Sequence, residues 1–293
     1  MIAENRRADH ARKRFTSTAR PLILPTMNTA NPSTADAPAH NAALAAQSSA
    51  LRRDTARDLV AIGVLVVAIA WVLSGVAGWG VDYGVKAVLC FAAGAWLVWR
   101  GLPHHPHPRF GPANRVTLAR MGLMALIAAL VGESLPRPPL DAESPALWSL
   151  VVVATVTAVL DAVDGALARR SGLTSAFGAR FDMETDAAFT LVLCALVLQA
   201  GQAGPWVLAS GLMRYAFVAA ARAWPWLDAP LAPSKRRQTV CVIQITTLIV
   251  CLGPIVPPWL ASALAALSLA LLTLSFAIDV RTLAQQRPTP LET

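Results

Sequence analysis

From residue 58 onward the chain alternates long apolar runs with short polar joints. A run of about 20 apolar residues, within a range of roughly 17–25, is long enough to cross a bilayer as a helix. The pattern predicts eight spanning helices, at residues 59–78, 84–100, 115–132, 146–167, 180–201, 205–222, 239–253 and 258–280. The sequence therefore predicts an all-α integral membrane protein.

The first 57 residues have a different composition, which is polar, basic and rich in Ala, Pro, Ser and Thr. Their arginines are not followed by the apolar core of about 7–15 residues that a secretory signal contains. We expect residues 1–57 to form a disordered basic tail, because such a composition buries too little apolar surface to fold. A transit peptide and a start at Met27 are the alternatives for this segment.

The composition of the whole chain supports a membrane protein. Of its 293 residues, 55% are hydrophobic and 14% are charged, whereas about 25% are charged in an average soluble domain. A soluble enzyme, a DNA-binding module and a secreted disulfide scaffold are therefore disfavoured. The four cysteines lie in apolar runs and none forms a CxxC pair. We expect them to be buried free thiols.

The net charge of +8 comes mainly from every second joint between the predicted helices. The basic joints carry Arg52, Arg53, Arg57, Arg100, Arg109, Arg115, Arg169, Arg170, Arg180, Lys235, Arg236, Arg237, Arg281 and Arg287. Because cytoplasmic loops are enriched in Lys and Arg, both termini are expected in the cytoplasm and nucleic acid is not an expected partner. The histidines at 104, 105 and 107 lie in one such joint, where we expect an exposed linker rather than a metal site.

Four aspartates lie at the basic ends of two consecutive predicted helices. An ionised carboxylate at membrane depth costs about 2.5–3.5 kcal/mol, so such residues are functional candidates. Two helical faces carry the pattern, with Asp161, Asp164 and Ala168 at i, i+3 and i+7, and Gly178, Asp182 and Asp186 at i, i+4 and i+8. If the faces meet, four carboxylates form one oxygen-rich site suited to Mg²⁺ or Mn²⁺. Glu184 is off this face.

The whole stretch fits the pattern D-x2-D-G-x2-A-R-x8-G-x3-D-x3-D, with Gly165 and Arg169 at the remaining fixed positions. It resembles the signature of the CDP-alcohol phosphatidyltransferase family, and the resemblance covers roughly residues 110–280. It implies a six-helix core at residues 110–282 and a tail at 283–293. Two extra helices at residues 58–101 precede the core and have no assigned role.

The resemblance also implies the roles of the site residues. Asp161, Asp164, Asp182 and Asp186 would hold Mg²⁺ or Mn²⁺, as two ions, and Asp186 would also be the general base. The residues along the CDP part would be Gly165, Ala168, Arg169 and Gly178, with Asn114 and Thr117 reaching the nucleotide. The enzyme would transfer a phosphatidyl group from a CDP-alcohol, with CDP-diacylglycerol as the favoured donor, to an alcohol, releasing CMP. The family further implies a homodimer.

A second set of basic residues is similar to the phosphatidylglycerophosphate synthase branch of the family. It consists of Arg214, Arg222, Lys235 and Arg236, which would suit an anionic acceptor such as glycerol 3-phosphate. The sequence differs from that branch at Tyr215, where an acid is usual, and in lacking a Gly-Lys-x-Lys-Thr segment. Inositol, serine and choline therefore stay open as acceptors. Arg120 either serves the site or extends to the membrane interface.

Two other functions remain as alternatives. An intramembrane prenyltransferase also binds pyrophosphate through Asp-rich helices, although its two Asp motifs lie far apart in the chain. A transporter or scaffold with a cation site is the non-enzymatic alternative. The favoured interpretation is a multi-pass phospholipid-synthesising enzyme of a bacterial inner membrane, with its active site facing the cytoplasm.

Overall fold

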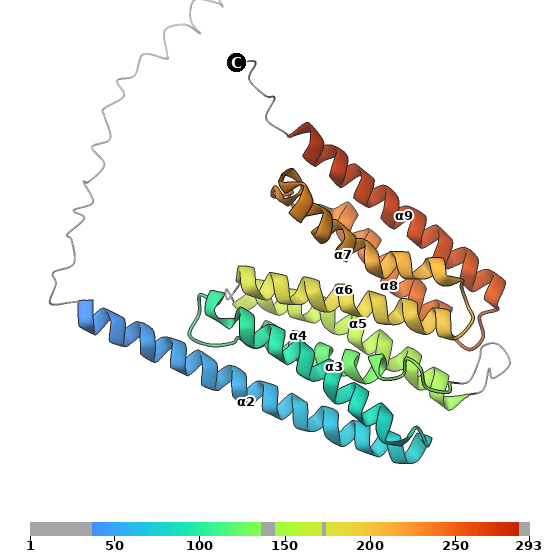
Figure 1. The fold of residues 1–293 in the computed structure, drawn as a ribbon, viewed down its shortest axis with the longest axis horizontal. Helices are drawn as coiled ribbons and strands as arrows, with labels where there is room; N and C mark the ends of the chain where they lie inside the picture. The colour runs from blue at the N-terminus through green and yellow to red at the C-terminus, as the bar shows by residue number, and fades with distance from the viewer. Residues whose placement is uncertain (1–36, 136–143, 172–173, 287–293) are drawn as a thin grey trace, which may run out of the picture. The chain divides into compact units, whose positions relative to one another are not determined.

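The computed structural model describes residues 37–135, 144–171 and 174–286. Within these ranges the chain forms eight α-helices and no strand (Figure 1). The helices are α2 (Ala37–Ala77), α3 (Gly80–Gly101), α4 (Pro112–Ala128), α5 (Pro145–Ser171), α6 (Ala176–Gln199), α7 (Leu208–Ala223), α8 (Lys235–Cys251) and α9 (Pro258–Gln285). Residues 46–293 make up one unit, and the packing described below lies within it. The expected all-α class is confirmed.

The first helix begins earlier than the apolar pattern predicts. It starts at Ala37, so residues 37–57, which we expected to be disordered, are helical. The reason is local: this segment is rich in Ala, Leu and Arg, which are the strongest helix formers, and its proline falls in the first turn, where proline is tolerated. At the other end, α9 continues to Gln285 and includes the start of the expected tail. Residues 1–36 and 287–293 lie outside the described residues.

Four of the helices are long and apolar enough to cross a membrane. They are α2, α3, α5 and α9, with candidate spans at Leu44–Ala77, Gly80–His104, Pro145–Arg170 and Pro258–Gln285. The prediction of eight spans is thus only partly confirmed. Helices α4, α7 and α8 have 16 or 17 residues, which is short for a span. Helix α6 carries one arginine and three acids in its first half.

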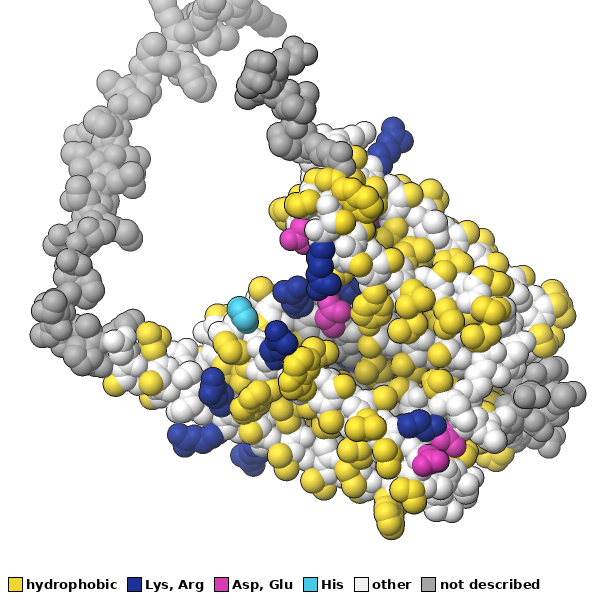
Figure 2. Space-filling model, viewed as in Figure 1, with side chains coloured by type: hydrophobic (Ala, Val, Ile, Leu, Met, Phe, Trp, Pro, Cys, Tyr) yellow, Lys and Arg dark blue, Asp and Glu magenta, His cyan; other side chains and the backbone are white. Residues whose placement is uncertain are grey.

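The surface is apolar in the manner of a protein surrounded by lipid. Trp71, Val76 and Trp259 expose 77%, 82% and 72% of their surface, and water would disfavour so many large apolar side chains on one molecule. Figure 2 shows hydrophobic side chains spread over the face in view, with Lys and Arg gathered mainly in its left half. This separation of charge from apolar surface fits a multi-pass membrane protein.

Helix α4 is the centre of the packing, since it contacts α3, α5 and α6. Gly111 caps its N-terminus with a φ of 87°, a conformation that glycine adopts without strain, and the helix begins at Pro112. Helices α2 and α4 approach each other closely at Gly122. A Cβ at this position would lie 2.9 Å from Ile62 of α2, so the lack of a side chain allows the approach. The preceding pair of helices therefore packs directly on the core.

An ionic contact joins this pair of helices to the start of α4. Arg115 on α4 contacts two carboxylates of α2, with Nη2 2.8 Å from Asp54 and Nε 2.7 Å from Asp58. The backbone N–H of Phe110 also donates to Asp54, at 3.0 Å. Helix α2 thus holds the segment that leads into α4.

The other end of α4 is held by α3. The last carbonyl groups of a helix lack partners within it, and side chains of α3 supply donors in this region. The Tyr83 hydroxyl donates to the carbonyl of Leu126 at 3.1 Å, and Lys86 Nζ donates to the carbonyl of Val131 at 3.0 Å. Helices α2 and α3 together therefore hold α4 at both of its ends.

The close approach of α6 and α7 gives a test of this packing. A Cβ at Gly211 would lie 2.5 Å from the Cα of Leu191, whereas one at Gly75 would meet nothing within 4 Å. We predict that Gly211→Ala lowers the thermal unfolding temperature in detergent, because overpacking against backbone costs about 1–3 kcal/mol. Gly75→Ala should leave it unchanged or raise it, since alanine is the better helix former. Equal behaviour of the two variants would contradict the packing described.

Candidate metal centre

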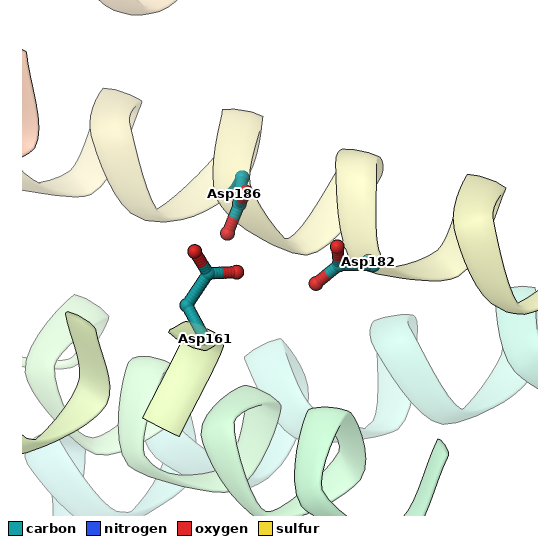
Figure 3. A group of neighbouring side chains, drawn as sticks. All are labelled: Asp161, Asp182 and Asp186. Carbon is teal, nitrogen blue, oxygen red and sulfur yellow. The ribbon is translucent and has the colours of Figure 1, made fainter. Parts of the chain in front are cut away.

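The aspartates singled out by the sequence lie on two helices, Asp161 and Asp164 on α5, and Asp182 and Asp186 on α6. Helix α6 begins at Ala176 and is capped by Ser175, whose side chain accepts a hydrogen bond from the N–H of Gly178 at 3.0 Å. Three of the carboxylates meet, because ligand oxygens of Asp161, Asp182 and Asp186 lie within 4.8 Å of one another. Figure 3 shows these three side chains pointing toward one another from the two helices.

A buried arginine lies among the aspartates. Arg120 of α4 is 1% exposed, and its Nη1 is 2.9 Å from Asp161, 2.8 Å from Asp164 and 2.7 Å from Asp182. Its Nη2 pairs with Asp186. One guanidinium thus contacts all four carboxylates. Of the two roles expected for Arg120, the structure supports the one within the site.

Asp164 has surroundings different from those of the other three aspartates. Its carboxylate is buried and accepts a hydrogen bond from the Thr117 hydroxyl at 3.1 Å as well as from Arg120. Arg120 also donates through Nε to the carbonyl of Thr157, at 3.3 Å. Asp164 is therefore part of the charged centre, but it lies outside the group of three whose oxygens converge.

The donor set fits a hard divalent cation. The converging ligands are carboxylate oxygens, which Mg²⁺ and Mn²⁺ prefer, and the side chains of Asp161, Asp182 and Asp186 are 33%, 38% and 21% exposed. The single guanidinium balances one of four carboxylates, and neighbouring carboxylates that remain ionised repel one another. A divalent cation bound by the three converging aspartates would supply the missing positive charge.

Four of the six residues expected along a nucleotide fall into two close pairs. A Cβ at Gly178 would lie 2.8 Å from Asn114 Oδ1, so the amide of α4 lies against the first turn of α6. On α5, a Cβ at Gly165 would lie 3.4 Å from Arg169 Nη1. Ala168 is on the same helix. The structure thus brings Asn114 beside Gly178 in the first turn of α6, and Thr117 into contact with Asp164 of the acidic centre.

His105 is buried, contrary to the exposed linker that we expected. It is 8% exposed, its ring packs 5.3 Å from that of Phe177, and its Nε2 lies 3.1 Å from Asn114 Nδ2. Burial lowers the pKa of the His105 imidazole. The histidine is thus part of the packing around Asn114. A basic, proline-containing joint carries no local signal of such packing.

Arg214, expected at an acceptor site, lies on α7 and pairs with Glu184 of α6 at 2.6 Å. Glu184 is thus outside the converging aspartates, as its helical position predicts. The Nε of Arg214 is buried and has no hydrogen-bond partner within the part of the chain that the structure describes. Arg214 therefore keeps one buried N–H that no described residue satisfies.

The basic segment that begins α8 contacts the C-terminal half of α9. Arg236 donates to the carbonyl of Ser275 at 2.7 Å and pairs with Asp279 at 2.6 Å. Asp279 was not among the expected site residues, because an acid after a long apolar run has the same local pattern as an interfacial residue. The other two expected acceptor residues, Arg222 and Lys235, are exposed.

The cysteines of the helices differ in their exposure. Within the described residues all four cysteines are free, as expected. Cys194 and Cys251 are buried and Cys90 is partly buried, but Cys241 is exposed. It lies on α8, one of the helices too short to qualify as a span.

Comparison with known proteins gives one match. A family model described as CDP-alcohol phosphatidyltransferase matches residues 110–280, more than half of the chain. The matched segment contains α4 to α8 and most of α9. The comparisons with curated proteins and with solved structures gave no match.

The metal centre predicts a metal-dependent stability. Mn²⁺ added to the EDTA-treated protein should raise its thermal unfolding temperature, because a ligand that binds the folded state stabilises it by about 2.7 kcal/mol at 100 times its Kd. Asp182→Asn should raise the Mn²⁺ concentration at half-maximal stabilisation at least tenfold. Asp82→Asn, which changes an exposed carboxylate in the first turn of α3, is the control and should leave it unchanged. Equal midpoints for Asp182→Asn and the native protein would contradict the assignment.

Proposed function

Because the chain belongs to the CDP-alcohol phosphatidyltransferase family, we propose that it transfers a phosphatidyl group from CDP-diacylglycerol to an alcohol and releases CMP. The observation that supports this most directly is the convergence of Asp161, Asp182 and Asp186 from two helices of the matched segment. Membership of this family disfavours the two alternatives, a prenyltransferase and a non-enzymatic transporter.

The three converging aspartates would hold the ion, and Asp164 adds its charge to the same centre. We propose Mg²⁺ or Mn²⁺, as two ions, from the oxygen-only donor set. When bound, such an ion neutralises charge on the diphosphate and stabilises the departing phosphate. The aspartates contribute by fixing the position of this charge between α5 and α6.

Asp186 is proposed as the general base. Its carboxylate would accept the proton of the acceptor hydroxyl as the oxygen attacks the phosphorus on the lipid side. The new O–P bond forms, the P–O bond to the second phosphate breaks, and its electron pair leaves with CMP. The side chain of Asp186 pairs with the buried Arg120 but is still 21% exposed, which supports access by an acceptor.

The CDP part of the donor is proposed to lie along the small and polar residues of α4, α5 and α6. These are Asn114, Thr117, Gly165, Ala168, Arg169 and Gly178. The contact between Asn114 and Gly178 supports this placement, since a side chain at residue 178 would displace the amide. Arg169 is exposed at the end of α5, where a guanidinium suits a phosphate oxygen.

An anionic acceptor such as glycerol 3-phosphate is proposed for the basic residues of α7 and α8. Arg214 supports this best, because its buried Nε has a proton to donate. Arg222, Lys235 and Arg236 extend the positive charge along the same two helices. We further propose a homodimer in a bacterial inner membrane, with the site and both termini facing the cytoplasm because the basic joints lie on that side.

The proposed function is tested by following CMP release. Purified protein with Mg²⁺ or Mn²⁺ and CDP-diacylglycerol should release CMP only when a suitable alcohol is added, and a panel of glycerol 3-phosphate, inositol, serine and choline identifies the acceptor. Asp186→Asn should lower the rate by about 10²–10⁴-fold, which is the usual contribution of a general base. Thermal unfolding shows whether the variant is folded, and Asp82→Asn serves as the control with normal turnover.

Normal turnover by Asp186→Asn would disprove the assignment of the base. Product formation from a prenyl diphosphate, with no CMP release from any CDP-lipid, would disprove the proposed reaction itself. Metal-dependent transport of a substrate without CMP release would have the same consequence.

The acceptor proposal predicts a selective effect at Arg214. Arg214→Gln should raise the KM for glycerol 3-phosphate at least tenfold, because a charged donor to the phosphate is lost, while the KM for CDP-diacylglycerol stays the same. Initial rates of CMP release measure both constants. Arg281→Gln, at an exposed position near the end of α9, is the matched control. An equal rise in both KM values would assign Arg214 to the fold rather than to the acceptor.

A further inference from the structure

We propose that Arg120 is an internal counter-ion, which holds the aspartates in the metal-free protein and which a divalent cation displaces from them. The inference rests on the metal site of the proposed function. Its basis is the position of Arg120, a guanidinium 1% exposed that contacts carboxylates on both α5 and α6.

Arg120 and a metal would use the same three carboxylates. The guanidinium lies 2.9 Å from Asp161 Oδ1 and 2.7 Å from Asp182 Oδ1, and it also pairs with Asp186 Oδ1. A Mg²⁺–oxygen bond of about 2.0–2.1 Å directs a lone pair of the carboxylate to the ion. A guanidinium on the same three carboxylates competes for those lone pairs, and its positive charge repels the cation.

The structure also shows where Arg120 is held outside the three converging aspartates. Its Nε donates to the carbonyl of Thr157 at 3.3 Å, and its Nη1 is 2.8 Å from Asp164, which Thr117 fixes from α4. Arg120 therefore keeps two partners when its contacts to the three converging aspartates are lost. The buried charge remains paired, and an unpaired buried charge would be costly.

Competition has two consequences that are linked by thermodynamics. If the metal weakens the contacts of Arg120, then Arg120 weakens the binding of the metal by the same free energy. Removal of the guanidinium should thus tighten metal binding. It should also destabilise the metal-free protein, because four carboxylates would then face one another without their shared cation.

The experiment compares Arg120→Gln, Arg120→Lys and the native protein by thermal unfolding across a Mn²⁺ titration. Arg120→Gln should unfold at a lower temperature without metal, and its half-maximal stabilisation should occur at a Mn²⁺ concentration at least tenfold lower. Arg120→Lys keeps the charge, so its midpoint should stay within about threefold of the native value. An unchanged or higher midpoint for Arg120→Gln would overturn the proposal.

A second measurement uses the native protein and does not depend on the folding of a variant. In protein labelled with ¹⁵N-arginine, the Nη–H signals of Arg120 report its contacts with the carboxylates. Saturating Mg²⁺ should shift these signals relative to EDTA while the Nε–H bond to Thr157 persists, and the signals of exposed Arg170 should stay constant. Unchanged Nη–H signals of Arg120 would overturn displacement. Failure of the proposed function would be seen separately, as absence of CMP release from CDP-diacylglycerol.

Discussion

The structure depends on the charge balance at one point, where four aspartates meet within a largely apolar bundle. Each carboxylate would be costly to bury alone, and a set of four is more so because the charges repel. Arg120 reduces this cost by pairing with the carboxylates. It lies on α4, a helix that packs against both α5 and α6. The positions of the three helices are therefore tied to one side chain, and the charge left over makes a divalent cation the natural partner of the site.

The local pattern predicts much of the fold and part of this site. The apolar runs predict eight helices in the order that the structure has. The spacing of Asp161, Asp182 and Asp186 predicts that their carboxylates face one another from two helices, as they do. The spacing did not separate Asp164 from the other three, because its hydrogen bond comes from Thr117, 47 residues earlier. Contacts between distant helices leave no trace in the periodicity of either one. The helix at residues 37–57 was missed for another reason, since its alanines favour a helix that buries little.

Two of the four basic residues expected to bind an acceptor, Arg214 and Arg236, are already paired with acids. Glu184 contacts Arg214, and Asp279 contacts Arg236. Such pairs orient long side chains before a ligand arrives, which reduces the entropy lost on binding. They also reduce the net positive charge, so selectivity for an anion would depend on the few donors that remain, such as the buried Nε of Arg214.

The attachment of α2 and α3 to the two ends of α4 has a consequence for where the catalytic unit begins. The family match starts at residue 110, but a chain cut there would leave Arg115 without the carboxylates of Asp54 and Asp58, and the carbonyl of Val131 without Lys86. It would also uncover Gly122, against which Ile62 packs. The packed unit is thus larger than the segment matched by the family model, and the helix that carries Arg120 is supported from outside that segment.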